Sequence, residues 1–391
     1  IKNSESVRAL WVDVDVDGDL DLYVANGGKS FSTYDRHLDD ALFINQGKGV
    51  LERNNTFATF PKALPTADVD TLDVNQDGLI DFVICEQFDM DTYGLPRSCY
   101  TMINQGNGFF AVKLLEGTNN IGMVTSIKAA DLNGDGFIDI VLSGQWMPII
   151  IIYNDGKQFE NPKIQKINNS TGLWNKMVVE DINNDGRLDI IAGNIGENNF
   201  YKIGDQMLVY DFDANGMMEQ IVVQEENGKY YPVHDGDEMF SQMPFLKKKF
   251  LYYYRFANAS IEEVFEKEVL EGAYKLQLEE LKSTIFLNSG TSYTKIYLPY
   301  QIQLSSVHAI CIDTQSKYLY FGGNTYRVKP QYGRQDASLG WSLSYTNNDK
   351  TLDYGKPIAL GIKGEIRDFY KSSKGLFFVT NSDKSGWIGF K

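Results

Sequence analysis

The stretch Asp13-Val-Asp-Val-Asp-Gly-Asp-Leu-Asp21 decides the fold, because the same nine-residue pattern returns four more times along the chain. In every copy an acidic or amide side chain stands at positions 1, 3, 5 and 9, and glycine stands at position 6. The residues at positions 1, 3, 5 and 9 are Asp13, Asp15, Asp17 and Asp21 in the first copy, Asp73, Asn75, Asp77 and Asp81 in the second, Asp131, Asn133, Asp135 and Asp139 in the third, Asp181, Asn183, Asp185 and Asp189 in the fourth, and Asp211, Asp213, Asn215 and Glu219 in the fifth.

Oxygen side chains at this spacing are typical of a loop that binds calcium. Ca²⁺ takes six to eight oxygen ligands at roughly 2.3–2.6 Å, and the glycine permits the sharp turn that aims them inward. A single copy could be only a turn, since Asp, Asn and Gly also crowd ordinary turns. The recurrence of all four ligand positions favours Ca²⁺ in the first four copies, and we predict it in the looser fifth copy too. The last ligand stands at position 9 rather than 12 between apolar runs, which indicates a loop joining two strands rather than an EF-hand.

The composition excludes some classes of function. The net charge of the 391 residues is −15 and no basic stripe offsets it, so we expect no nucleic-acid partner. The five copies hold sixteen ligand carboxylates, and the ten positive charges of five Ca²⁺ ions would bring the net charge from −15 to −5. No run of about eighteen apolar residues occurs, so we expect no transmembrane segment in this chain.

The calcium loops also bear on location. Extracellular loops of this kind are tuned to about 10⁻⁴–10⁻³ M and would stand mostly empty in the cytosol. The chain begins at Ile1 without methionine or a signal-like segment, so we expect a mature or truncated stretch from which a signal or lipid anchor could have been lost. An extracytoplasmic location follows, either secreted or associated with the cell surface or outer membrane.

The pattern sits inside a longer repeat. Its first four copies begin at residues 13, 73, 131 and 181, and a period of 50 to 60 residues is the mark of a propeller or solenoid. An apolar strand enters and leaves each copy, and a hairpin with an Asn-x-Gly turn follows at Asn45, Asn104, Asn154 and Asn288. Four antiparallel strands in about 55 residues make one propeller blade.

We therefore predict an all-β fold, a single seven-bladed propeller over residues 1–391 with four-stranded antiparallel blades. The fifth calcium loop is placed between the outer strands of the fourth blade, and the first segment, 1–6, completes the last blade. A helical insertion is expected over 235–272, packed against one face of the propeller, because Ser260-Ile-Glu-Glu263 is a capping box and Gly272 a natural stop. The predicted blades are 7–60, 68–118, 126–170, 176–233, 273–304, 307–361 and 364–391.

Cysteine and histidine usage gives little sign of catalysis. Cys85 and Cys99 lie on what look like adjacent antiparallel strands, so a disulfide is one possibility, whereas Cys311 reads as a core residue. The histidines are only three, His37, His234 and His308, and no Gly-x-Ser-x-Gly, His-Glu-x-x-His or phosphate loop is present. We predict neither a catalytic residue nor an organic cofactor, and we expect a protein that is not an enzyme.

The loops, the Asn-x-Gly hairpins and the blade period together resemble the FG-GAP/VCBS repeat family, the propeller type also seen in integrin α-subunits. A narrower resemblance is to the long FG-GAP proteins of Bacteroidota that often carry an ASPIC/UnbV domain, which is absent here. The resemblance implies that positions 1, 3, 5 and 9 ligate Ca²⁺ and that the protein is exported or anchored at the surface. The narrower resemblance rests on Gly144-Gln-Trp-Met-Pro148, on the segments 243–249 and 259–263, on Gly322-Gly-Asn324 and on the segment 333–340.

The function that these features favour is a calcium-stabilised extracytoplasmic binding module, part of a surface lipoprotein or cell-envelope complex. Its partner would be an envelope protein or a glycan. One alternative is a polysaccharide-active lyase or hydrolase on the same scaffold; another is an accessory subunit of an outer-membrane nutrient-uptake (TonB-dependent transporter) complex that uses 235–272 as its contact. Aromatic residues near strand ends could stack on sugars or pack between blades, and Arg334 with Asp336 reads as an internal ion pair. The aromatic residues are Trp146, Trp174, Trp341 and Tyr326.

Overall fold

The computed structural model describes residues 4–28, 30–32, 35–55, 65–89, 91–106, 108–348, 351–381 and 383–389. Within them the fold is all-β, as predicted: antiparallel sheets carry most of the regular structure, and the α-helices are short. No helix in these ranges has the length and apolar character needed to span a membrane.

Six sheets in the described residues have the strand order of propeller blades, in which each strand pairs with the next toward the outside. The apolar runs that flank each nine-residue pattern form the two innermost strands. The first three blades consist of β1 (Ser6–Val12), β2 (Asp21–Asn26), β3 (Ala41–Asn45) and β4 (Leu51–Arg53); β5 (Thr66–Leu72), β6 (Asp81–Glu86), β7 (Cys99–Asn104) and β8 (Phe110–Leu114); and β9 (Met123–Ala130), β10 (Asp139–Met147), β11 (Ile150–Tyr153) and β12 (Lys163–Lys166) with the short β13 (Gly172–Leu173).

The other three blades follow the same scheme with small departures. They consist of β14 (Lys176–Glu180), β15 (Asp189–Gly193), β20 (Thr284–Asn288) and β21 (Tyr293–Tyr297); β22 (Val307–Asp313), β23 (Tyr318–Gly323), β24 (Trp341–Asn348) and β25 (Thr351–Tyr354) with the short β26 (Ile358–Ala359); and β27 (Glu365–Ser372), β28 (Gly375–Asn381) and β29 (Gly386–Ile388). Short 3-10 turns η1 (Arg36–Leu38), η2 (Ile302–Leu304) and η3 (Pro330–Tyr332) lie in connections.

The innermost strands lie side by side in a ring: β1 contacts β5, and the contacts continue through β9, β14 and β22 to β27. Arg8 on β1 closes the circle, because its guanidinium lies 3.4 Å from Asp68 of β5 and 3.8 Å from Asp368 of β27. Lys128 on β9 likewise pairs with Asp70 of β5 at 3.1 Å. The inner-strand carboxylates named here therefore each lie against a cation from a neighbouring blade.

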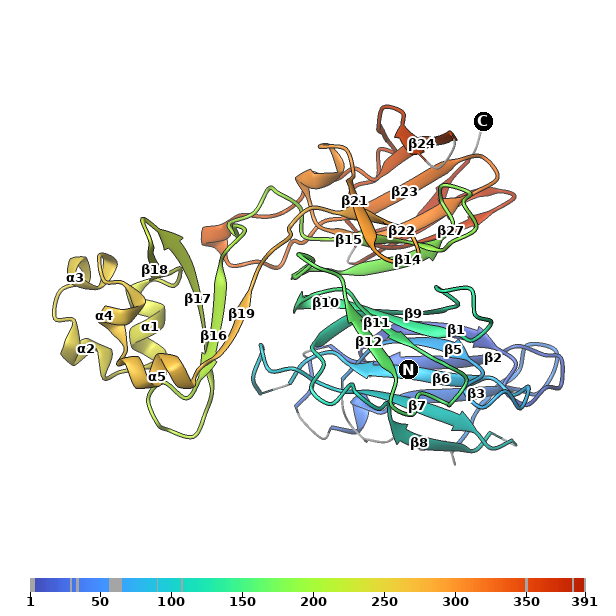
Figure 1. The fold of residues 1–391 in the computed structure, drawn as a ribbon, viewed down its shortest axis with the longest axis horizontal. Coiled ribbons are helices and arrows are strands. Elements are labelled where there is room, and N and C mark those ends of the chain that lie inside the picture. Colours follow the sequence, from blue (N-terminus) through green and yellow to red (C-terminus); the bar gives the residue numbers. More distant parts are fainter. Residues whose placement is uncertain are drawn as a thin grey trace.

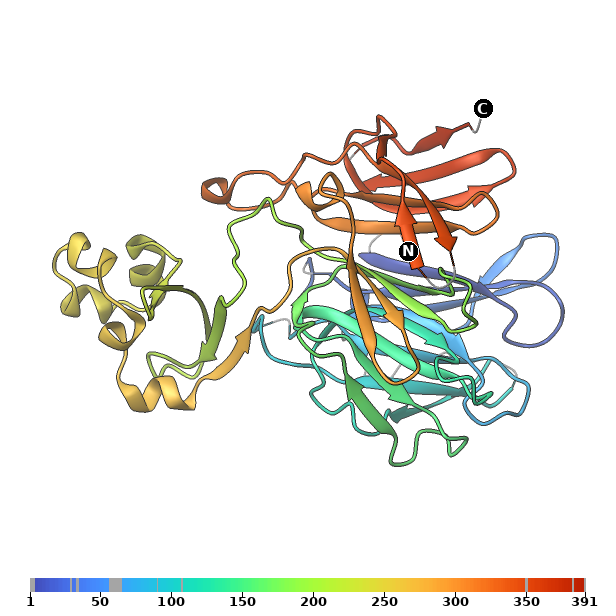
Figure 2. The same cartoon turned by 45° about the horizontal axis from the view of Figure 1, so that its top comes forward.

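The predicted fourth and fifth blades, 176–233 and 273–304, are wrong as separate units. β15 pairs with β20, so residues 176–193 and 284–297 build one blade. The strands between them form their own sheet outside the ring, β16 (Gln206–Tyr210), β17 (Glu219–Glu226), β18 (Lys229–Pro232) and β19 (Tyr274–Gln277). Of the seven sheets described, six thus form the ring, and the seventh belongs to an inserted unit. We call residues 194–283 the insertion; it projects from the ring at the left of Figures 1 and 2.

The helices of the insertion cover this extra sheet and not a face of the propeller, which corrects the prediction. Their buried side chains form one cluster with Leu208, Phe212, Ile221 and Val223 of the sheet and its loop. The helices are α1 (Gly236–Gln242), α2 (Leu246–Lys249), α3 (Tyr253–Ala257), α4 (Ile261–Val264) and α5 (Lys267–Gly272). The predicted capping box is present at the start of α4, where Ser260 N–H donates to Glu263 Oε2 at 2.8 Å, and α5 ends at Gly272 as expected.

Three sets of contacts hold the insertion to the ring. A hydrophobic cluster joins Met207 and Val209 of β16 to Phe88, Met123 and Trp146 of the second and third blades. At the connection to β20, the Glu280 side chain is 2 % exposed and its Oε2 accepts from Lys295 Nζ at 2.8 Å. Farther out, Glu238 of α1 pairs with Lys329 of the fifth blade at 2.7 Å. The insertion is thus anchored at its base, and only its outer part stands free of the ring.

The described part of the first segment does not complete the last blade. Ser6 pairs with Asn26, and Gly27 N–H donates to Glu5 O at 2.9 Å, so this segment extends the first blade. The last blade has three strands within the described residues, and residues 1–3 lie outside them.

A disulfide joins Cys85 of β6 to Cys99 of β7, the possibility that the sequence raised. The two residues are directly opposite in the sheet, with their Cα atoms 4.0 Å apart. Cys311 carries a free thiol on β22 and packs beside the cluster formed by the fifth and sixth blades. The second blade is therefore cross-linked between its two middle strands.

Candidate metal centres

The five acidic loops lie where the sequence placed them, between paired antiparallel strands. The first four connect the two innermost strands of blades one to four, and the fifth connects β16 to β17 in the insertion. The fifth blade keeps only Asp313 of the pattern, whose carboxylate pairs with Lys371 and accepts from Ser316 N–H. Candidate metal centres therefore occupy four consecutive blades and the insertion.

Each loop is wound around the carboxylate at position 1. The oxygens of Asp13 accept hydrogen bonds from Asp17 N–H at 3.2 Å and Gly18 N–H at 3.0 Å. The same two bonds recur at Asp73, Asp131, Asp181 and Asp211. Position 6 has a φ between 83° and 91° in all five loops, which only glycine adopts freely. Even Val16 at position 4 has a φ of 62°, an unusual conformation for a β-branched residue.

The position-9 carboxylate is buried and links three parts of a blade. In the fourth blade, Asp189 Oδ2 accepts from Ile182 N–H of its own loop at 3.2 Å, and Oδ1 accepts from Asn288 N–H at 2.7 Å. Asp21, Asp81 and Asp139 make the same pair of bonds. All four aspartates are fully buried, whereas Glu219 keeps only the bond within its loop, from Phe212 N–H at 2.9 Å.

The loops bring their predicted ligands together to different degrees. In the first loop, carboxylate oxygens of Asp13, Asp15 and Asp21 lie within 4.8 Å of one another, and the fifth loop gathers Asp211, Asp213 and Glu219 in the same way. In the second and third loops the position-3 amide instead donates to the position-5 carboxylate, at 2.9 Å from Asn75 to Asp77 and at 2.8 Å from Asn133 to Asp135. Position 5 also accepts from the N–H of position 7 in all five loops.

The electrostatics of the loops suit a cation. Burial, and to a smaller degree the charges of the neighbouring loop carboxylates, raise the pKa of Asp139 and of Asp189 to about 6. Burial and the nearby charge of Asp21 also raise the pKa of Asp15. Crowded carboxylates with raised pKa values bind either protons or a positive ion. Every side chain at positions 1, 3, 5 and 9 offers an oxygen atom, which is the ligand chemistry of a hard cation such as Ca²⁺.

Two of the four hairpin asparagines, Asn104 and Asn288, have a second role that the Asn-x-Gly pattern does not show. Their side chains cross to the acidic loop of the preceding blade: Asn104 Nδ2 donates to Val14 O at 2.8 Å, and Asn288 Nδ2 donates to Leu132 O at 3.0 Å. Asn347 of the fifth blade reaches Ile182 O at 3.4 Å. The Asn-x-Gly pattern predicts tight turns at these residues, and their Oδ1 atoms do accept the N–H of the turn glycine. The repeated spacing between loop and hairpin is the signal that could have revealed the link.

The other residues singled out in the sequence have structural contacts. Trp174 is fully buried and its Nε1–H donates to Ser170 O at 2.8 Å. Arg334 lies 3.9 Å from the centre of the Tyr326 ring and 3.7 Å from Asp336, so the predicted ion pair is present. The histidine rings contact neighbouring polar groups: His37 with Asp35, His234 with Glu238, and His308 with Ser306 and Thr325.

Removing the hydrogen bond between blades should lower the free energy of unfolding more than removing the turn hydrogen bond alone. Asn288→Ala deletes the bonds to Leu132 O, Leu188 O and Gly290 N–H, and it leaves buried carbonyl oxygens without a partner. We expect it to lower the free energy of unfolding by about 2–3 kcal/mol. The matched control is Asn154→Ala, because the only side-chain bond described for Asn154 is the turn bond from Gly156 N–H. Urea unfolding measures both variants, and equal losses would contradict a link between blades.

Comparison with known proteins gives one match to a family model and a set of distant structural neighbours. The model of the family described as "FG-GAP-like repeat" matches residues 131–192, the third loop through to the inner strands of the fourth blade. The solved structures that resemble this chain include Saccharomyces cerevisiae Sqt1 (TM-score 0.42, 9 % identity, 92 % of this chain and 68 % of that one) and the Dos1 propeller (TM-score 0.42, 7 % identity, 97 % and 76 %). No curated protein sequence matches the chain. The ring of sheets makes the chain a β-propeller repeat protein, and its residues 131–192 match an FG-GAP-like repeat.

Proposed function

We propose that this protein is a calcium-stabilised, extracytoplasmic binding module, part of a surface lipoprotein or cell-envelope complex, and that the outer end of the insertion contacts a protein partner. A propeller of this repeat type is a scaffold for interaction. The observation that carries the proposal is a group of large side chains on and before α3 that the protein leaves uncovered. Leu251, Tyr252, Tyr253 and Tyr254 are 76, 57, 60 and 63 % exposed.

This group has the composition of a protein contact. Tyrosine supplies large amphipathic area at low conformational cost and is enriched at the centres of interfaces. Tyr252 and Tyr254 lie side by side with their ring centres 5.9 Å apart, and the exposed Lys247 and Lys248 of α2 precede them. A partner with an apolar centre and an acidic rim would fit this surface. Its place at the far end of the insertion leaves room for a bulky partner (Figure 1).

The calcium part of the proposal rests on the loops. Calcium would be held by the residues at positions 1, 3, 5 and 9, where it would offset the repulsion of carboxylates that the fold crowds together. Because the position-9 carboxylates also bond to a neighbouring hairpin, an ion there would stabilise each blade as a whole. The disulfide between Cys85 and Cys99 supports an oxidising compartment outside the cytosol. Millimolar calcium in such compartments suits loops of the extracellular class.

Chelation should therefore destabilise the protein. At free Ca²⁺ ten times the dissociation constant, each site adds about 1.4 kcal/mol to the free energy of unfolding, so EDTA should lower the melting temperature. Asp13→Asn removes a position-1 carboxylate and should reduce the Ca²⁺ stoichiometry in calorimetric titration by one. Asp19→Asn is the matched control, because Asp19 stands at position 7 of the same loop with its side chain exposed. A melting temperature that does not change in EDTA would contradict the proposal that calcium stabilises the protein.

The stabilisation by calcium should depend on pH. In the calcium-free protein the pKa of Asp139 and Asp189 is about 6, above the ordinary value of 3.8, so protons favour the folded state and the free energy of unfolding falls as pH rises from about 4 to about 6. Calcium must displace those protons. The rise in melting temperature on adding Ca²⁺ should therefore be larger at pH 7.5 than at pH 5. Equal rises at the two pH values would contradict the loop carboxylates as ligands.

The contact surface can be tested without disturbing the core. Leu251→Ser, Tyr252→Ser and Tyr254→Ser together remove the exposed group but spare Tyr253, whose hydroxyl donates to Asp237 at 2.6 Å. A tagged full chain should recover one stoichiometric protein from solubilised cell envelope, and the triple variant should lose it at an unchanged melting temperature. The matched control replaces one exposed aliphatic residue and two exposed tyrosines of the ring with serine, namely Ile358, Tyr300 and Tyr370. If the triple variant captures the same protein as well as the control does, the contact lies elsewhere.

A further inference from the structure

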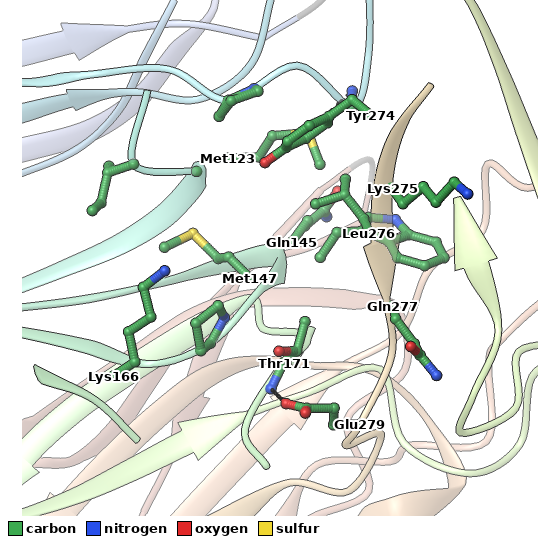
Figure 3. Close-up of a pocket in the computed structure, with 16 residues that line it drawn as sticks. Met123, Gln145, Met147, Lys166, Thr171, Tyr274, Lys275, Leu276, Gln277 and Glu279 are labelled. Carbon is green, nitrogen blue, oxygen red and sulfur yellow. Dashed lines mark hydrogen bonds between the residues drawn. The ribbon is translucent and has the colours of Figure 1, made fainter. Parts of the chain in front are cut away.

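A cavity of about 270 Å³ lies where the insertion meets the ring. Three segments wall it: the connection around Gly94 in the second blade, the ends of β9, β10 and β12 in the third blade, and β19 of the insertion. Figure 3 shows Tyr274 and Leu276 of β19 on the side of Met123 and Met147, whereas Lys275 and Gln277 point to the other side of the strand. The cavity therefore exists only because the insertion is docked against the third blade.

The backbone of the cavity wall is strained. Trp146 has a φ of 56°, in the left-handed region that a bulky aromatic residue rarely adopts, and the register of β10 against β13 shifts between Gln145 and Met147. Such conformations and bulges cost free energy and persist where the surroundings impose them, often beside functional sites. Trp146 is 1 % exposed, and its ring packs edge-on against Tyr201. The motif Gly144–Pro148, which the sequence singled out, thus shapes the wall of this cavity.

The inner wall is apolar and ends in an accessible aromatic ring. Met123 and Met147 are almost fully buried, and Leu276 packs against the hydrophobic cluster that contains Trp146. Tyr274, in contrast, is 43 % exposed and stands at the mouth. A ligand that enters would lay an apolar face on this wall, with the tyrosine ring beside it.

Hydrogen-bond donors and acceptors stand around the same cavity. Gln145 Oε1 accepts from Tyr93 Oη–H at 2.5 Å, which leaves its amide N–H groups as donors. Glu279 Oε2 accepts from Thr171 N–H at 3.0 Å, which leaves its other oxygen as an acceptor. Lys166 extends toward Met147 in Figure 3, and among the described residues its ammonium has no ion-pair or hydrogen-bond partner. Both signs of charge and both hydrogen-bonding roles are present.

We propose that this cavity binds a sugar ring, independently of the protein contact on α3. A sugar has an apolar C–H face for the wall of Met147, Leu276 and Tyr274, and hydroxyl groups that both donate and accept toward Gln145, Lys166 and Glu279. A phosphate or sulfate ion would meet the Glu279 carboxylate, and a purely apolar molecule would use none of the polar groups. The volume of about 270 Å³ lies just below the usual range for ligand pockets, about 300–1,000 Å³, so a single ring fits better than a long chain.

The test uses the full chain with calcium and saturation-transfer NMR. The probes are glucose, galactose, mannose, N-acetylglucosamine and glucuronate, each alone at millimolar concentration, with p-hydroxyphenylacetate as a non-sugar of similar size. We expect transfer to the ring protons of at least one sugar. Tyr274→Ala should raise its dissociation constant about tenfold, and Lys166→Ala should raise it by a smaller factor. Tyr300→Ala, an exposed tyrosine outside the cavity, should leave it unchanged.

Three results would overturn the assignment. One is the absence of transfer to every sugar in a protein with a normal melting curve. Another is a sugar signal that both Tyr274→Ala and Lys166→Ala leave intact, which would place the sugar elsewhere. The third is transfer to p-hydroxyphenylacetate alone, which would assign an aromatic acid to the cavity. The triple α3 variant tests binding of the protein partner and should leave the sugar signals unchanged. The experiments can therefore contradict either proposal without contradicting the other.

Discussion

The buried carboxylate at position 9 is the group on which the blades depend. Asp21, Asp81, Asp139 and Asp189 each accept one N–H from their own loop and one from the hairpin two strands farther out. A carboxylate without water is costly unless hydrogen bonds compensate it, so the loop and the hairpin have to meet in one register. In the second and fourth blades the hairpin asparagine also reaches the acidic loop of the preceding blade. The acidic residue therefore fixes the geometry within each of these four blades, and in two of them the asparagine amide beside it also fixes the geometry between blades.

The sequence predicted the parts of the fold that are repeated and local. The nine-residue pattern, the strands beside it, the Asn-x-Gly hairpins and the capping box at Ser260 each depend on residues close together in the chain, and each lies where it was expected. The pairing of β15 with β20 could not be read in this way, because about ninety residues separate the two strands. A spacing of thirty residues between the fourth and fifth patterns did indicate an irregularity, but it could not show that β16 to β19 leave the ring.

The same distinction, between residues close together in the chain and residues far apart in it, applies to the candidate sites. The metal loops are local, and their residues were all named from the pattern, although the amide contacts of Asn75 and Asn133 depend on side-chain orientation that no spacing shows. The cavity beside Trp146 is assembled from three distant segments. Its sequence signals were an unexplained Gly144–Pro148 motif and a tryptophan near a strand end, and neither identifies Tyr274 or Glu279 as neighbours. Sites of this second kind require the tertiary structure.

The place of the insertion has a consequence for how the chain is made. β14 and β15 leave the ribosome well before β20 and β21. The fourth blade therefore has only its two inner strands while residues 194–283 are synthesised. During that interval Asp189 has no Asn288 to bond, and the apolar outer edge of β15 is open to other strands. Pairing across such a long stretch is slow compared with local contacts. The insertion, with a hydrophobic core of its own, can fold first and bring β19 and the connection to β20 back to the ring. Completion of the fourth blade is thus the step at which folding during synthesis should pause. A chaperone would have most effect at this step, by covering the exposed edge of β15.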